Sequence, residues 1–228
     1  MAIRLEEKKL KGSLLDREKI ILEISKGKKV LHLGCTDHPF TMERFMDGTL
    51  LHDKIQKIAK KLVGIDISKE GIEAMKYLGF VNLMLANVEE VMRIEPDEDF
   101  DVIVAGELLE HISNVGRFFE NVSHIMNENT LLVITVPNAH SIKGFLRVLF
   151  GNELIHPDHV YYFSPATIDH ISKRYMFKVQ GYHYYLGEPS PFIKKLLFMP
   201  LKYFIKFFSP FVADGMVFVL EKTNNTHD

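Results

Sequence analysis

The chain has 228 residues, of which 46% are hydrophobic and 25% are charged, and its formal net charge is −2. This size and balance are typical of one soluble globular domain, and the near-neutral charge argues against a nucleic-acid partner. The single cysteine excludes an intramolecular disulfide framework, the charged N-terminus is unlike a secretory signal, and no run approaches the ~20 apolar residues of a membrane span, so we expect a cytoplasmic protein.

The first 138 residues alternate helical and strand patterns. Helical spacing of apolar residues predicts helices over 14–25, 41–46, 51–62, 69–79 and 107–126. Short apolar runs predict strands over 29–34, 62–68, 81–87, 100–107 and 130–138. Because strands that alternate with amphipathic helices form parallel sheets covered on both faces, the pattern predicts an α/β fold.

The pattern changes after Asn138. A helix is expected over 141–151, a loop over 156–165 and a second helix from Pro165, with Ser164 as its N-cap. Two closing strands are expected over 177–187 and 215–222.

Polar and small residues follow the first four strands of the predicted sheet. In an open parallel sheet, ligands bind beyond the carboxyl ends of the strands, near the point where the strand order reverses. Gly34 allows close approach of the backbone there, and the Asp66 carboxylate can accept hydrogen bonds from both hydroxyls of a ribose. Asn87 offers an amide for the edge of an adenine, and Val88 an apolar surface for its face. The strand ends therefore suit a nucleoside.

Five segments carry a resemblance to a known family: "VLHLGC", "LVGIDIS", "LANVEEV", "FDVIVAGELLEHI" and "LLVITVPN". In this order they resemble class I S-adenosylmethionine-dependent methyltransferases, nearest to the small-molecule branch that includes the ubiquinone-biosynthesis O-methyltransferases. The resemblance covers roughly residues 28–180. It implies a Rossmann-like, doubly wound sheet of seven strands, mostly parallel with an antiparallel last strand. We interpret 1–228 as one domain with a cofactor-binding core at 28–138 and substrate-side segments at 139–165 and 186–211.

The resemblance also implies a set of residues that bind S-adenosylmethionine. The backbone from Gly34 through Thr36 would hold the methionine part, Asp66 the ribose, Asn87 and Val88 the adenine, and Gly106 with Glu107 the sulfonium end. The full set is His32, Gly34, Cys35, Thr36, Asp66, Ile67, Asn87, Val88, Gly106 and Glu107.

The sequence departs from the family pattern at three kinds of position. The family often has an acidic residue at His32, glycine at Thr36 and His38, and aspartate at Asn87. The missing glycines argue against a dinucleotide, whose pyrophosphate needs them. Purely structural roles remain as alternatives: Asp66 could cap a helix, and Asn87 could be a turn residue.

The stretch "ELLEH" is expected to begin a helix, so that Glu107, Glu110 and His111 share one face. With His159 from "HPDH", these residues are candidate metal ligands, as in some relatives with an E-x-x-E-H helix, although we do not favour a divalent metal. A general base among His111, His156 and His159 is an alternative, and purely structural roles are another. Our candidate catalytic residues are His111, His159 and Glu107.

The segment 191–211, "PFIKKLLFMPLKYFIKFFSPF", combines four lysines with many Phe and Leu and contains no acidic residue. Two interpretations are open: a cover for the sheet edge or homodimer contact, and an amphipathic surface that touches an anionic membrane or a lipid-linked acceptor.

We expect an enzyme that methylates a hydroxyl oxygen of a small molecule, such as a quinone precursor, a glycan or a lipid-linked intermediate. The alternatives are a non-catalytic subunit that binds S-adenosylmethionine and a nucleic-acid methyltransferase. The modest charge weighs against the second of these.

Overall fold

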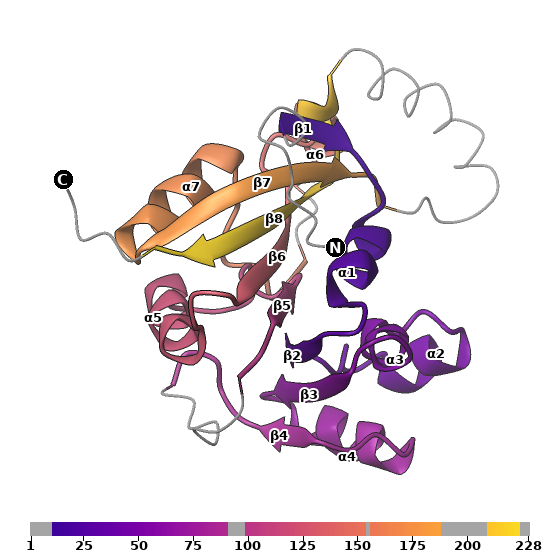
Figure 1. The fold of residues 1–228 in the computed structure, drawn as a ribbon. Coiled ribbons are helices and arrows are strands. Elements are labelled where there is room, and N and C mark those ends of the chain that lie inside the picture. The colour runs from indigo at the N-terminus through magenta and orange to yellow at the C-terminus, as the bar shows by residue number, and fades with distance from the viewer. Residues whose placement is uncertain (1–10, 91–98, 154–155, 188–208, 224–228) are drawn as a thin grey trace.

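The protein is described from a computed structural model, in which residues 11–90, 99–153, 156–187 and 209–223 are placed. They build one eight-stranded sheet of order β1-β7-β8-β6-β5-β2-β3-β4 (Figure 1). The strands are β1 (Lys11–Leu14), β2 (Lys29–Leu33), β3 (Lys61–Asp66), β4 (Leu83–Leu85), β5 (Val102–Gly106), β6 (Leu131–Pro137), β7 (Phe177–Tyr185) and β8 (Gly215–Lys222). The helices are α1 (Arg17–Ser25), α2 (Thr41–Met46), α3 (Leu51–Gln56), α4 (Lys69–Tyr77), α5 (Val115–Ile125), α6 (Ile142–Leu149) and α7 (Pro165–Arg174), with a 3-10 turn, η1 (Pro210–Val212).

The direction of the strands confirms the mostly parallel sheet with an antiparallel last strand. β8 runs antiparallel to both β6 and β7, while every other neighbouring pair is parallel. The strand order reverses at β2, which pairs with β3 on one side and with β5 on the other. The carboxyl ends of β2 and β5 are therefore the point at which this fold places a ligand.

The strand β1 was not predicted. It pairs in parallel with β7 at the sheet edge, which makes eight strands instead of seven. The predicted helix over 14–25 begins only at Arg17, because Asp16 adopts an extended backbone and its carboxylate caps the helix by accepting from the Lys19 amide at 2.9 Å.

Both faces of the sheet are covered, as the apolar strand runs predict. In β2, Val30 packs on one face with Ile20, Ile21 and Ile55 of α1 and α3. Leu31 and Leu33 pack on the other face, where α5 contributes Phe118, Phe119 and Val122. This alternation follows from the two-residue period of a strand, which points successive side chains to opposite faces.

The predicted helix over 107–126 is wrong in its first eight residues, because α5 begins at Val115. Asn114 is its N-cap and accepts from the Arg117 amide at 3.0 Å. Glu107 has a left-handed backbone with φ of 52°, which no helix accommodates, and its amide donates to the Thr135 carbonyl at 2.9 Å. Glu107, Glu110 and His111 therefore do not share a helix face. The helical segment predicted over 51–62 is also shorter and ends at Gln56.

Within the placed ranges, every helix falls short of the length and apolar character needed to cross a membrane. The segment 191–211 lies outside the described residues up to 208, so the structure bears on neither interpretation of it.

Candidate functional site

A cavity of about 670 Å³ lies beyond the carboxyl ends of β2, β3, β4 and β5. Of the residues predicted to bind a cofactor or to act in catalysis, its walls include Gly34, Thr36, Asp66, Ile67, Asn87, Val88, Gly106, Glu107 and His111. These residues come from four strand ends that are far apart in the sequence. The structure thus gathers most of the predicted set into one space, which we call the switch-point cavity.

The turn after β2 is held by the glycine that the sequence singled out. Gly34 has a φ of 70°, a conformation that side chains disfavour, and its amide donates to the Ile65 carbonyl at 2.8 Å. A Cβ atom at Gly34 would lie 3.2 Å from Cδ1 of Leu108. The chain therefore passes close to the 107–114 loop, and a larger residue would push the two apart.

Asp66 organises the same turn through its carboxylate. Oδ2 accepts from the Thr36 amide at 3.0 Å and from the Thr36 hydroxyl at 2.9 Å, and Oδ1 accepts from the Ser68 amide at 2.9 Å. An ionised carboxylate offers about four acceptor positions, so one position, on Oδ1, remains for a ligand hydroxyl. Accepting both hydroxyls of a ribose would require the Thr36 hydroxyl to turn away. Ser68, rather than Asp66, caps α4, because its hydroxyl accepts from the Gly71 amide.

Asn87 and Val88 form the wall of the switch-point cavity that follows β4. The side-chain oxygen of Asn87 accepts from the Glu89 amide at 2.9 Å, which is the bond expected of a turn residue. The carbonyl of the buried Val88 accepts from Nδ2 of Asn121 at 2.9 Å. Asn87 therefore acts as a turn residue, and it also lines the cavity.

Glu107 is the centre of a hydrogen-bond network that the sequence did not predict. Its Oε1 accepts from the Tyr185 hydroxyl at 2.5 Å and from the Thr135 hydroxyl at 3.1 Å. The Arg17 Nε atom donates to the same Thr135 hydroxyl at 3.0 Å. Burial and the neighbouring Glu107 carboxylate raise the pKa of Tyr185, so its hydroxyl keeps its proton and remains a donor.

Arg17 and Tyr185 line the switch-point cavity but stand outside the five family segments. Arg17 is the first residue of α1, and its guanidinium lies against the backbone of Gly106, where a Cβ would be 2.9 Å from Nη2. Tyr185 ends β7, on the far side of β8 and β6 from the predicted motifs. The position of Tyr185 near the carboxyl end of a predicted strand is the sequence signal that could have pointed to it.

Two predicted cofactor-binding residues do not reach the cavity. His32 is buried on β2, where its ring stacks on that of His52 with 5.4 Å between centroids and an Nδ1–Nδ1 distance of 3.2 Å. Cys35 is buried against Gly64, where a Cβ atom would lie 2.7 Å from its sulfur, and burial raises the pKa of its thiol. Both side chains therefore serve the packing behind the turn, where Cys35 and the His52 partner of His32 both lie against Gly64.

Glu110, one of the candidate metal ligands, has a buried side chain. Its side chain is 0% exposed, and neither carboxyl oxygen makes a hydrogen bond within the described part of the chain. Burial, and secondarily the charge of Glu107, raises its pKa to about 8. Near neutral pH this carboxyl is therefore largely protonated, and it lies outside the group of metal-ligating side chains formed by His111, His156 and His159.

A second cavity, of about 900 Å³, lies between α6 and the loop that follows β6. Its walls include Pro137, Asn138, His140, Ile142, Gly144, Phe145, Val148, Tyr162 and Asp214. His159 lines this cavity, His111 lines the switch-point cavity, and His156 and Gly187 line both. We call the second space the α6 cavity.

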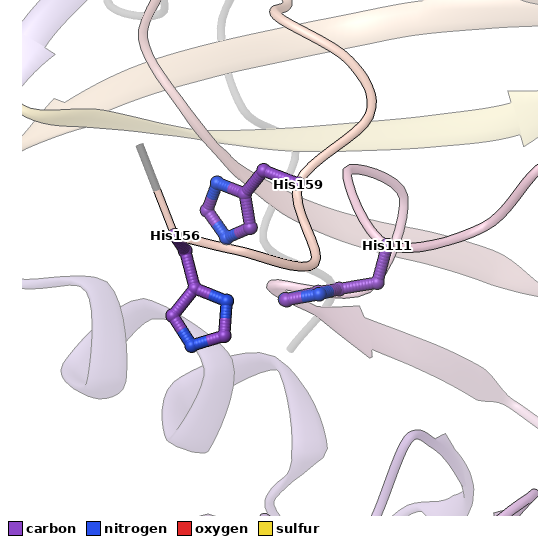
Figure 2. A group of neighbouring side chains, drawn as sticks. All are labelled: His111, His156 and His159. Atoms are coloured by element: carbon purple, nitrogen blue, oxygen red, sulfur yellow. The ribbon is translucent and has the colours of Figure 1, made fainter. Parts of the chain in front are cut away.

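The histidines between the two cavities converge from two loops (Figure 2). The ring centroids of His111 and His159 are 4.6 Å apart, those of His156 and His159 5.1 Å, and those of His111 and His156 5.5 Å. Burial lowers the pKa of His111 and of His159, so both imidazoles are neutral near neutral pH. All three histidines were considered as a general base, and of them His111 and His159 were the candidate catalytic residues.

A comparison with known families assigns the class of the chain. The profile of the methyltransferase domain family matches residues 7–181, and the chain belongs to this family. A structure of a SAM-dependent methyltransferase from Archaeoglobus fulgidus shares the fold, with a TM-score of 0.60 and 17% identity over 90% of this chain and 91% of that one.

Two further similarities bear on the acceptor. The ubiquinone biosynthesis O-methyltransferase of Bradyrhizobium diazoefficiens is 27% identical over 134 residues, which cover 57% of this chain and 47% of that protein. The matched region is thus about half the length of this relative. The structure of the small RNA methyltransferase HEN1 is as similar in fold, with a TM-score of 0.60 and 15% identity over 93% of this chain and 25% of that one. Fold alone does not distinguish small-molecule from RNA acceptors.

Proposed function

We propose that this protein transfers a methyl group from S-adenosylmethionine to a hydroxyl oxygen of a small molecule, such as a quinone precursor, a glycan or a lipid-linked intermediate. Membership of the methyltransferase domain family supports the donor. The similarity to a ubiquinone biosynthesis O-methyltransferase supports the oxygen acceptor. The expectation of a small acceptor also agrees with the net charge of −2.

The switch-point cavity has groups that suit each part of the donor. The free acceptor position on Asp66 Oδ1 suits a ribose hydroxyl, and the Gly34 turn leaves space for an amino-acid chain. The Arg17 guanidinium borders this space and suits the donor's carboxylate. The donor supplies an electrophilic methyl carbon, and the protein's task is to align it with the acceptor oxygen.

The observation that carries the proposal is the junction of the two cavities. Methyl transfer needs a donor site and an acceptor site that share an opening, and His156 borders both spaces. We assign the α6 cavity to the acceptor. Imidazoles at the junction can take the hydroxyl proton as a general base or hold an ion that binds the acceptor oxygen. Glu107 lies on the donor side, where its bonds to Tyr185 and Thr135 fix it as a wall of the site.

The assignment can be tested by filling the α6 cavity. Gly144 lines it, and a Cβ atom there would meet only Ser141 Cβ at 3.9 Å, so Gly144→Phe has room to extend into the space. Leu149→Phe is the matched control, because Leu149 lies on the same helix, is 64% exposed and does not line the cavity. The measurements are calorimetric binding of S-adenosylhomocysteine and formation of labelled product from a panel of phenols, catechols and glycosides.

We expect Gly144→Phe to bind S-adenosylhomocysteine like the wild type and to lose turnover, while Leu149→Phe retains both. Absence of S-adenosylhomocysteine binding by the wild type at millimolar concentration would refute the proposal. Binding without product from any small acceptor would favour a non-catalytic subunit, and product formed only on RNA would favour the nucleic-acid alternative.

A further inference from the structure

We propose that His111, His156 and His159 form a binding site for a late first-row divalent metal ion, with Zn²⁺ as the reference ion, and that its open coordination position faces the α6 cavity. The proposal deepens the function proposed above, since the ion would bind the oxygen that receives the methyl group. The sequence did not favour a metal, and the candidate ligands that it offered were Glu107, Glu110, His111 and His159. The structure assigns a different, all-imidazole set.

The geometry of the three side chains supports a single ion. One ligand nitrogen from each lies within 4.8 Å of the others, and within the described ranges this is the one group of three metal-ligating side chains that meets so closely. Zn–N bonds of about 2.0–2.1 Å in a tetrahedral site separate two ligand nitrogens by about 3.4 Å, so closure needs a movement on the order of 1 Å. Figure 2 shows the three rings turned toward one common space.

The nearby glutamates stand outside the cluster, so its ligand set is all nitrogen. Glu110 is fully buried outside the group of three imidazoles, and Glu107 accepts from Tyr185 and Thr135. An all-nitrogen set disfavours Mg²⁺ and Ca²⁺, which prefer oxygen ligands, and favours Zn²⁺, Ni²⁺, Co²⁺ and Cu²⁺. A site with three protein ligands keeps a fourth position for water or substrate.

The two loops that supply the ligands are tied together beside the cluster. The Val160 amide donates to the Glu110 carbonyl at 2.8 Å, and the Tyr161 hydroxyl donates to the Ser113 carbonyl at 2.8 Å. His111 therefore has a fixed position relative to His159, the pair with the shortest ring separation. Nδ1 of His156 accepts from the Asp158 amide at 3.4 Å, and the Asp158 carboxylate lies 3.8 Å from the same nitrogen.

The ion would assist transfer by binding the acceptor as its oxyanion. Coordination lowers the pKa of the hydroxyl, whose proton leaves to solvent. The oxygen lone pair then forms the O–CH₃ bond while the C–S bond of the donor breaks, and its electron pair stays on sulfur. No general base is required in this scheme, so the imidazoles serve as ligands.

The test uses the untagged, full-length protein treated with chelator and then titrated with Zn²⁺ by calorimetry, without donor or acceptor. Co²⁺ titrated in parallel reports tetrahedral coordination through its visible absorption bands. His111→Ala, His156→Ala and His159→Ala are compared with His170→Ala, which removes an exposed histidine of α7 outside the cluster. Circular dichroism checks that each variant is folded.

We expect the wild type and His170→Ala to bind one Zn²⁺ per chain and to show the Co²⁺ bands. Each cluster variant should lose at least about tenfold in affinity, and Mg²⁺ should give no heat. Failure of the wild type to bind Zn²⁺, or unchanged binding in folded His156→Ala, would overturn the site. Zn²⁺ binding is measured independently of turnover. Methylation by the chelated protein, together with absence of Zn²⁺ binding, would refute the metal site alone. Zn²⁺ binding without methylation would refute only the proposed function.

Discussion

The switch-point cavity and the α6 cavity lie side by side but differ in how their walls are held. In the first, Gly34 is fixed by a bond to Ile65, and the Asp66 carboxylate accepts three hydrogen bonds from the turn and from the start of α4. In the second, the longest wall is α6, which has no buried residue at all, and Phe145 is 65% exposed while lining the space.

This difference indicates what determines the shape of each cavity. The walls around Asp66 are held by hydrogen bonds that join the backbones of neighbouring strand ends. We expect these walls to tolerate few substitutions. The walls beside α6 are formed by exposed apolar side chains, whose replacement costs the fold little. We therefore expect substitutions near Asp66 to abolish ligand binding and substitutions on α6 to change which acceptor is used.

The largest effect should follow Asp66→Ala. It removes the proposed acceptor for the donor's ribose, and with it three hydrogen bonds that hold the turn and the start of α4. Hydrogen bonds to a charged group contribute about 1.5–3 kcal/mol each, so S-adenosylhomocysteine affinity should fall about 100-fold or more. Asp101→Ala is the matched control, because Asp101 accepts from the Lys29 amide at the opposite end of β2. If calorimetry gives the two variants equal affinity for S-adenosylhomocysteine, Asp66 does not contact the donor.

A smaller effect concerns the packing behind the turn. Burial lowers the pKa of His52 to about 4 and that of its partner His32 well below its usual range. His52 is therefore neutral in the folded protein, while it takes up a proton below about pH 6.5 in the unfolded chain. Its contribution to stability is complete above pH 6.5 and is lost as the pH falls toward 4, by about 2 kcal/mol at pH 5.

His52→Leu isolates this contribution. Urea unfolding between pH 5 and pH 7.5 should show that the variant gains about 2 kcal/mol relative to the wild type as the pH falls. His124→Ala, which removes an exposed histidine of α5, should follow the wild-type curve. Parallel curves for His52→Leu and wild type would mean that the imidazole pair is not held neutral, and that the donor side is less tightly packed than its hydrogen bonds indicate.

The same contrast explains how much the sequence predicted. The α/β fold, the parallel strands and the residues at their ends were readable, because each depends on patterns within single segments and on the order of those segments. Ser164 is the N-cap of α7, as predicted, since capping is also local. The lining of the switch-point cavity could be outlined because strand ends in one parallel sheet meet at one edge.

What the sequence did not predict depends on contacts between distant segments. Tyr185 reaches Glu107 across 78 positions, and no spacing rule connects them. The helix expected from Glu107 failed because Thr135, on the next strand, holds the Glu107 amide and carboxylate in a left-handed turn. The sequence placed His156 and His159 on one loop, but it did not reveal the hydrogen bond from the Val160 amide to the Glu110 carbonyl that ties this loop to the 107–114 loop.

The smallest effect should come from the exposed wall, with Phe145→Ala. Phe145 contributes a partly exposed ring to the α6 cavity, so its loss should cost about 1 kcal/mol of acceptor binding, or about fivefold in KM, with kcat and S-adenosylhomocysteine affinity unchanged. The free energy of unfolding should stay within about 0.5 kcal/mol of wild type, because the ring is not part of the core. Leu149→Ala, equally exposed but outside the cavity, should change neither KM nor stability. A loss of kcat or of donor affinity in Phe145→Ala would show that α6 helps to hold the donor side, and the two cavities would then have to be treated as one site with shared walls.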